Sequence, residues 1–199
     1  MYSLFYRYLQ KIILKNSFYD DILKIIHNEN IKHIVEIGCA DSIILNNLDE
    51  KYFYNGFDVE DNFIQKSKLK FSDNKKYKFK TKSIHEINLD EYNETETIIL
   101  LVGVFHHVND DYIKIFLKKS ERFKVYAIDA VRLKDQKFFT KLLMDFDKGK
   151  YVRFEDQYKR LLAGYDFILA RNKYLNFKYD YFISIKNLNL KKIENILQL

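Results

Sequence analysis

The sequence predicts an α/β fold, in which a doubly wound, mostly parallel sheet of seven strands carries helices on both faces and ends in an antiparallel strand. Three observations lead to this prediction. From His33 onward, short apolar runs alternate with stretches of helical spacing. Alternating strands and helices form parallel sheets that are covered on both faces. The 199 residues also contain no Pro/Gly/Ser-rich linker or internal repeat, which suits a single domain.

The expected strands are the short apolar runs, and the last two form a terminal pair with an antiparallel member. They cover residues 33–38, 52–58, 77–81, 97–103, 124–131, 165–175 and 178–187. The expected helices between them have apolar residues at helical spacing. They cover residues 41–50, 61–71, 109–120, 136–146 and 154–164.

The two ends of the chain lie outside this alternation. Spacing at the start suits two amphipathic helices, over residues 2–15 and 17–27. Charged residues interrupt their apolar positions, so we expect neither a membrane span nor a signal peptide. The tail, residues 188–199, suits either a last helix or a frayed end.

Composition limits the class of partner and the compartment. The net charge is +6, but lysines are interleaved with Asp and Glu along the chain, which indicates a solvated basic surface and not a nucleic-acid groove. The only cysteine, Cys39, excludes an internal disulfide and a Cys-rich zinc site. Cytoplasmic localisation is therefore expected.

A candidate ligand site lies in "HIVEIGCADSIIL", where Gly38 separates a strand containing Glu36 from a helical run that Asp41 is expected to cap. Ligands of such sheets bind where the carboxyl ends of strands meet at the switch point. Asp58 ends the second strand, twenty residues after Gly38, which is the spacing at which an acidic residue meets a ribose. The glycines of a dinucleotide fingerprint are replaced by Ala40 and Ile43, which disfavours NAD.

These residues resemble motifs of the class I methyltransferases that use S-adenosylmethionine. The first motif of that family, an acidic residue followed by G-x-G-x-G, is matched with two small replacements by Glu36, Gly38, Ala40 and Ser42. The second, tyrosine-x-glycine-x-aspartate, is matched by Tyr54, Gly56 and Asp58.

Further matches extend the resemblance from about Ile31 to Ile185. "LLVGVFHHVNDD" is similar to the fourth-strand region of a large subgroup, and "DFDKGKYVRFEDQYKRLL" is similar to a stretch of small-molecule and sugar-type members. One departure is Ser83, because family members often carry an aspartate there, near the adenine amino group.

The resemblance implies a Rossmann-like enzyme that transfers a methyl group from S-adenosylmethionine to a small-molecule or saccharide acceptor by in-line displacement. It divides the domain into N-terminal helices (1–30), a cofactor-binding core (31–130), a helical substrate-side segment (131–164) and the terminal strand pair (165–186). The implied cofactor contacts are Glu36, Gly38, Cys39, Ala40, Asp58, Val59, Ser83, Ile84, Gly103, Val104 and His107.

The adjacent His106 and His107 are candidates to accept a proton from the acceptor. We expect no metal, because adjacent side chains diverge and no third histidine lies one helical turn away. His107 is assigned to the cofactor side. The alternative is a hydrogen-bonded core histidine that holds the loop. Asp129, at the end of the fifth strand, is interpreted as a structural cap.

The substrate-side segment has a basic cluster, which predicts contacts to an anionic or hydroxyl-rich acceptor. The cluster consists of Lys148, Lys150 and Arg153, and Tyr151 is a further candidate contact. The alternative is a solvated helix-turn-helix with Gly149 as the turn.

Two other functions stay open from the sequence. A nucleic-acid methyltransferase acting on ribose or ring carbon is possible, whereas base amino methylation needs a proline pair and this chain has no proline. A non-catalytic S-adenosylmethionine-binding partner protein is favoured slightly by the lost glycines and by Ser83.

Overall fold

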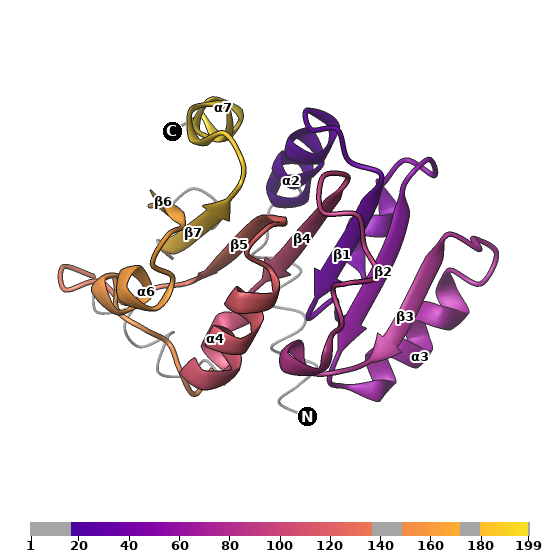
Figure 1. Ribbon diagram of the computed structural model, residues 1–199, viewed down its shortest axis with the longest axis horizontal. Coiled ribbons are helices and arrows are strands. Elements are labelled where there is room, and N and C mark those ends of the chain that lie inside the picture. Colours follow the sequence, from indigo (N-terminus) through magenta and orange to yellow (C-terminus); the bar gives the residue numbers. More distant parts are fainter. Residues whose placement is uncertain (1–16, 137–148, 172–179, 199) are drawn as a thin grey trace.

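The computed structural model describes residues 17–136, 149–171 and 180–198. Its strands form one sheet of seven in the order β3-β2-β1-β4-β5-β7-β6 (Figure 1). The strands are β1 (His33–Ile37), β2 (Phe53–Asp58), β3 (Tyr77–Thr81), β4 (Thr97–Val102), β5 (Lys124–Ala130), β6 (Asp166–Ala170) and β7 (Tyr181–Lys186). The first five are parallel, and β7 is antiparallel to both β5 and β6. The predicted fold class is thereby confirmed.

The strand order reverses beside β1, and open α/β sheets bind their ligands at such a reversal. β1 pairs in parallel with β2 on one side and with β4 on the other. The chain therefore leaves the carboxyl ends of β1 and β4 in opposite directions. In open α/β sheets this arrangement forms a binding crevice between neighbouring strand ends.

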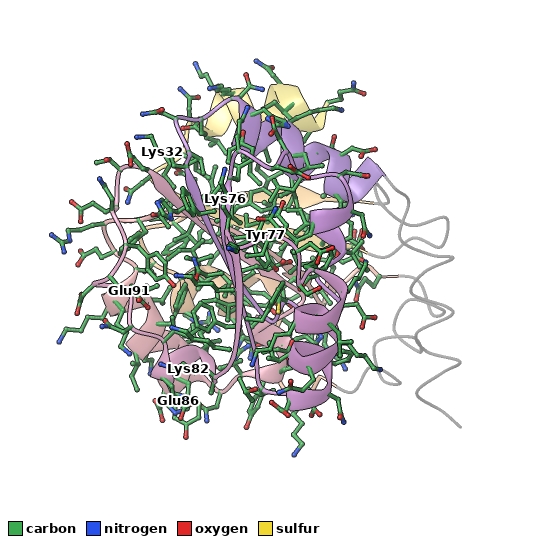
Figure 2. All side chains as sticks on the ribbon, turned by 90° about the vertical axis from the view of Figure 1, so that its right-hand side faces the viewer. Lys32, Lys76, Tyr77, Lys82, Glu86 and Glu91 are labelled. Atoms are coloured by element: carbon green, nitrogen blue, oxygen red, sulfur yellow. The ribbon has the colours of Figure 1, made fainter. Side chains whose placement is uncertain are left out.

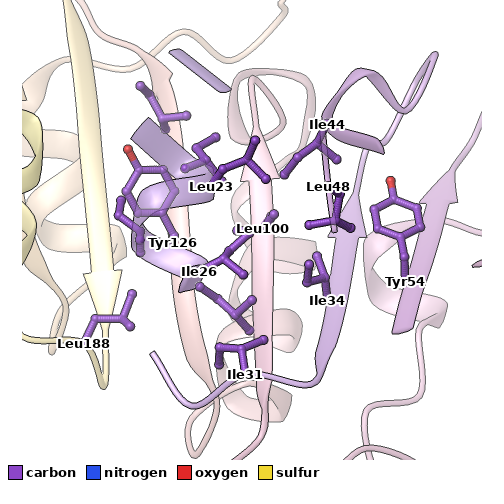
Figure 3. Packing of buried hydrophobic residues seen from close by; sticks show 14 of the residues in the cluster. Leu23, Ile26, Ile31, Ile34, Ile44, Leu48, Tyr54, Leu100, Tyr126 and Leu188 are labelled. Atoms are coloured by element: carbon purple, nitrogen blue, oxygen red, sulfur yellow. The ribbon is translucent and has the colours of Figure 1, made fainter. Parts of the chain in front are cut away.

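Helices cover both faces of the sheet, as predicted. One face carries α2 (Ser17–His27), α3 (Asp61–Lys70) and α7 (Leu190–Leu197), and the other carries α4 (Asp110–Lys119) and α6 (Glu155–Leu161). Figure 3 shows the first core, where Leu23 and Ile26 of α2 lie over Ile34 and Leu100 of the central strands. Burying each such side chain contributes about 1.5–3 kcal/mol to the free energy of unfolding.

The helix predicted over residues 41–50 is wrong in type and in length. Only a single 3₁₀ turn, η1 (Ile43–Asn46), follows β1. Asp41 is not its cap, because the preceding residue is Ser42, which is left-handed and makes no side-chain capping bond. The turn ends at Asn46 and is followed by Asn47 as its C-cap, and asparagine side chains compete for backbone hydrogen bonds and so disfavour helix interiors.

Two further 3₁₀ turns, neither expected from the sequence, follow strands at the candidate site. They are η2 (Ile84–Glu86), after β3, and η3 (Phe105–His107), after β4. The tail forms α7, which settles the alternative between a helix and a frayed end in favour of the helix. The predicted helix over 2–15 and nearly all of that over 136–146 lie outside the described residues.

β3 is an edge strand, and Figure 2 views the molecule from this side. Lys78 and Lys80 are exposed on it, on either side of the buried Phe79. Charged edge residues discourage pairing with a strand of another chain. Figure 2 also shows Lys76 and Lys82, which flank the strand, on this side of the molecule. Among the described helices, none has the length and apolar character needed to cross a membrane.

Candidate functional site

The carboxyl ends of β1 and β4 meet at Gly38. This residue has a left-handed φ of 72°, and an added Cβ would lie 2.7 Å from Val104 Cγ2 in the loop after β4. The close approach of the two loops therefore requires glycine, and the left-handed backbone favours it. The structure thus brings together Gly38 and Val104, two residues that the sequence predicted at one site.

The residues at the three glycine positions of the G-x-G-x-G motif are all left-handed, although two of them have side chains. φ is 72° at Gly38, 44° at Ala40 and 49° at Ser42. Ser42 is fully buried, and its hydroxyl oxygen lies 3.2 Å from that of Ser67 in α3. The turn keeps a glycine-like backbone at a cost, because the left-handed conformation disfavours an L-residue by about 1–2 kcal/mol.

Replacing Ala40 by Gly is expected to stabilise the fold by about 0.5–1 kcal/mol, because relief of the left-handed strain exceeds the entropy that glycine loses on folding. Thermal unfolding measures the effect as a rise in Tm. Ala163→Gly is the matched control, since exposed Ala163 is not among the left-handed residues and its replacement should lower the Tm. A lower Tm for Ala40→Gly would contradict strain at this position.

Asp58 holds the turn from the end of β2. Its Oδ2 accepts a hydrogen bond from the Ala40 N–H at 2.9 Å, and its Oδ1 accepts one from the Glu60 N–H at 2.9 Å. The side chain is buried, whereas the next residue, Val59, is 65% exposed. A carboxylate has about four acceptor positions, so Asp58 keeps acceptor capacity for hydroxyl groups of a ligand.

Glu36 is buried on β1 and accepts a hydrogen bond from the hydroxyl group of Tyr54. Burial, and to a smaller extent the charge of Asp58, raise the pKa of the Glu36 carboxyl to about 7, although the Tyr54 hydrogen bond opposes this shift. Sequence reasoning missed Tyr54 as the partner. The strand register could have indicated it. Gly56 lies opposite Glu36 in the sheet, and Tyr54, two residues before Gly56, has its side chain on the same face.

Gly56 and Cys39 pack against each other beneath this pair. An added Cβ on Gly56 would lie 2.9 Å from both Cys39 Sγ and Tyr54 Cε1. Burial, with a smaller contribution from the charge of Glu36, raises the pKa of the Cys39 thiol far above its usual value. A neutral, buried thiol acts as a small packing residue and not as a nucleophile.

Ser83 begins the η2 turn beside the end of β3. It forms a capping box with Glu86, and its hydroxyl oxygen lies 2.9 Å from His85 Nδ1. Ile84 is buried. The Lys82 N–H donates to Asp58 O at 2.9 Å, which ties this turn to the end of β2. The predicted contact of Ser83 and Ile84 with adenine stays a prediction.

His106 is buried in the η3 turn and is hydrogen-bonded through Nδ1 to Asp129 Oδ1 at the end of β5. Asp129 also accepts hydrogen bonds from the Phe105 N–H at 2.6 Å and the Ala130 N–H at 3.0 Å. Asp129 is therefore more than a strand cap. The parallel pairing of β4 with β5 could have indicated this contact, because the carboxyl ends of parallel neighbours share one edge.

His107 is exposed, and its ring centroid lies 4.0 Å from that of His106. The two histidines therefore differ in environment, and the buried partner of Asp129 is His106. The assignment of His107 to the cofactor side stays a prediction. Among the described residues, no group of three or more His, Cys, Asp or Glu side chains could hold a metal ion.

Arg153 is buried and does not face solvent as a member of a basic cluster would. Its guanidinium donates to Phe105 O at 2.7 Å, Val108 O at 2.7 Å and Tyr151 O at 3.1 Å. Two further bonds, of 3.0 and 2.6 Å, reach Asp110 Oδ1. These five bonds use the five N–H donors of the side chain, so Arg153 could hold an acceptor molecule only by giving up bonds to the protein.

The other predicted substrate residues differ in placement. Lys150 is exposed and Tyr151 is 40% exposed, so both can meet a ligand, whereas Lys148 lies outside the described residues. The Tyr151 N–H donates to His106 O at 2.9 Å. Residues 149–153 therefore lie against the histidine turn, and the alternative of a purely solvated turn does not describe this segment.

Comparison with known proteins supports the fold through structure and not through sequence. No family model and no curated protein matches this chain. Among solved structures, it is similar to an S-adenosylmethionine-dependent methyltransferase from Clostridium acetobutylicum, with a TM-score of 0.68, 12% identity and coverage of 94% of this chain and 99% of that one. It is also similar to the N-methyltransferase NodS from Bradyrhizobium japonicum, with a TM-score of 0.63, 11% identity and coverage of 87% and 96%.

Some of the matching structures are longer than this chain. It spans about half of a protein from Nostoc punctiforme, covering 56% of its length with 85% of this chain at a TM-score of 0.64 and 14% identity. At these identities the similarity establishes the fold: the chain has the Rossmann-like fold found in these methyltransferases.

Proposed function

We propose that the protein binds S-adenosylmethionine at the crevice between β1, β2 and β4 and transfers its methyl group to a small-molecule or saccharide acceptor. The main support is that the N–H groups of the turn after β1 are already hydrogen-bonded within the protein. Those of Gly38 and Cys39 donate to Phe57 O at 2.7 and 3.0 Å, and that of Ala40 donates to Asp58. Few backbone donors are left there for the pyrophosphate of a dinucleotide, which needs such a cradle.

The short η1 turn strengthens this distinction. A dinucleotide places its pyrophosphate at the N-terminus of the helix that follows the first strand, and here a single 3₁₀ turn replaces that helix. Two acidic residues, Glu36 and Asp58, flank the crevice instead. The carboxyl groups of Asp58 and Glu36 suit the amino group and the sulfonium of S-adenosylmethionine better than a phosphate.

Each part of the cofactor has a matching group on the chain. Glu36 and the turn at Gly38 would hold the amino-acid end, and Asp58 would accept hydrogen bonds from the ribose hydroxyl groups. Val59 would pack on the adenine, because this apolar side chain is exposed beside Asp58. The cofactor supplies an electrophilic methyl group on sulfur, and the chain contributes the alignment of that methyl with the acceptor atom.

The His106–Asp129 pair would activate the acceptor. Asp129 fixes the proton of the imidazole on Nδ1 and stabilises the imidazolium that forms when the ring accepts a second proton. A base of this kind helps a weakly acidic nucleophile, such as a hydroxyl group. Lys150 and Tyr151, exposed beside the histidine turn, would contact the acceptor.

Isothermal titration calorimetry tests the cofactor assignment. We expect S-adenosylmethionine and S-adenosylhomocysteine to bind in preference to NAD. Asp58→Ala should weaken that binding by about 1–3 kcal/mol, because it removes a charged acceptor and the support of the turn. Asp90→Ala is the control, because Asp90 is exposed on the loop before β4.

Equal or tighter binding of NAD, with no heat from either sulfur ligand, would reject the assignment. Binding of S-adenosylmethionine without methyl transfer, in a screen of small acceptors with labelled methyl donor, would favour the non-catalytic binder. Transfer of label to an RNA or DNA substrate alone would favour the nucleic-acid methyltransferase.

A further inference from the structure

We infer that Gly149 and Arg153 form a strap that positions His106, so that a segment distant in sequence sets the geometry of the proposed base. The significance of this geometry for catalysis rests on the proposed function, whereas the positioning itself can be measured without a substrate. Neither residue is assigned a contact with cofactor or acceptor in this proposal.

Arg153 fixes the backbone on both sides of the histidine. Its Nη1 and Nη2 groups bind the carbonyl oxygens of Phe105 and Val108, which bracket His106 and His107. The bonds to Asp110 attach the same guanidinium to the first residue of α4. A planar, five-donor side chain can connect these acceptors at once, and a lysine cannot.

Asp129, in β5, binds the same turn. It accepts hydrogen bonds from the Phe105 N–H and from His106 Nδ1. The two groups of Phe105, its N–H and its carbonyl, are thereby bound by different elements, β5 and the strap. The strap is itself anchored to the sheet, because the Arg132 N–H beyond β5 donates to Arg153 O at 2.9 Å.

Gly149 sets the position of the imidazole ring directly. An added Cβ would lie 2.3 Å from His106 Cδ2 and 3.0 Å from both His106 Cγ and His106 O. The clash with His106 is therefore the reason for glycine at this position.

Gly103, the residue after β4, lies near another carbon of the same ring. An added Cβ on Gly103, at the end of β4, would lie 3.4 Å from His106 Cε1. The ring thus has Gly149 of the strap close to Cδ2 and Gly103 near Cε1, and its Nδ1 is hydrogen-bonded to Asp129. A methyl group on Gly149 must displace either the ring, which breaks the contact with Asp129, or the strap, which breaks the bonds of Arg153.

The test is the variant Gly149→Ala, followed by two-bond ¹H–¹⁵N NMR of the histidine rings. In the wild type we expect His106 to show a single tautomer with the proton on Nδ1, and the signal is assigned by its loss in His106→Ala. Gly149→Ala should lose the single-tautomer pattern of His106, and leave the affinity for S-adenosylhomocysteine unchanged within about twofold. Once an acceptor is known, turnover should fall about 100-fold, as a misplacement of about 1 Å can cause.

Arg153→Lys is the second variant, because Arg153→Ala removes five bonds at once and can unfold the protein. The lysine is expected to broaden or shift the His106 signal while the fold is retained. Arg160→Lys is the matched control, since Arg160 is an exposed residue of α6 that pairs with Asp156, and it should leave the His106 signal in place.

An unchanged tautomer pattern of His106 in both Gly149→Ala and Arg153→Lys, with both proteins folded, would overturn the strap. The result is distinguishable from failure of the proposed function. A wild-type protein that shows the strap signature but does not bind S-adenosylmethionine would reject the function and retain the positioning.

Discussion

Replacement of His106 by Ala is expected to lower methyl-transfer turnover by about 10²–10⁴-fold, the usual contribution of a positioned general base. Affinity for S-adenosylmethionine should fall much less, because Glu36, Gly38, Asp58 and Val59, which are proposed to hold the cofactor, belong to β1, β2 and the turns that follow these strands. Steady-state kinetics with an acceptor found by the labelled-methyl screen, together with calorimetry, separate the two effects. His33→Ala is the control. His33 stacks on Phe53 at the amino end of β1, whereas the proposed site lies at the carboxyl ends of the strands.

Asp129→Asn tests the second member of the pair. The amide keeps the shape of the side chain but removes the charge that stabilises the imidazolium. We expect a similar loss of turnover, and a double variant no slower than His106→Ala alone, because residues that act as a unit have non-additive effects. Turnover that is independent of His106 would instead mean that the histidine only holds the η3 turn, which is the alternative left open by the sequence.

Replacement of Glu36 by Gln is expected to stabilise the unliganded protein by about 3 kcal/mol at pH 8 and by much less near pH 4.5. Burial raises the pKa of the Glu36 carboxyl from 4.5 to about 7. Between these two values the unfolded chain has lost the proton while the folded chain keeps it, so wild-type stability falls as the pH rises through this window. A shift of this size corresponds to roughly 3 kcal/mol.

Glutamine has no charge to bury and can still accept the Tyr54 hydrogen bond, so the variant should lose this slope. Urea unfolding at several pH values between 4.5 and 8 measures the difference between wild type and variant. Glu91→Gln is the control, because Glu91 is exposed on the loop before β4 (Figure 2). A constant difference across the pH range would show that Glu36 titrates at its ordinary value in the folded protein.

The sequence by itself determined the fold class, the strand order along the chain and the residues at the ends of β1 and β2. Apolar runs of strand length are a local property, and the twenty-residue spacing of Gly38 and Asp58 follows from one strand-to-strand connection. The amphipathic helix Ser17–His27 was predicted with its observed limits for the same reason. Local patterns of this kind need no knowledge of the partners that a side chain meets.

Only the tertiary structure decided the roles of residues whose partners are distant in sequence. Asp129 meets His106 because β5 pairs with β4, and Arg153 binds the carbonyl groups beside His106 across more than forty residues. The helix expected over 41–50 was lost because Ala40 and Ser42 take left-handed conformations in a turn that Asp58 holds. The sequence suggested a basic patch at residues 148–153, but its arginine, Arg153, is buried in the structure. Long-range hydrogen bonds set these outcomes, and a periodic pattern carries no information about them.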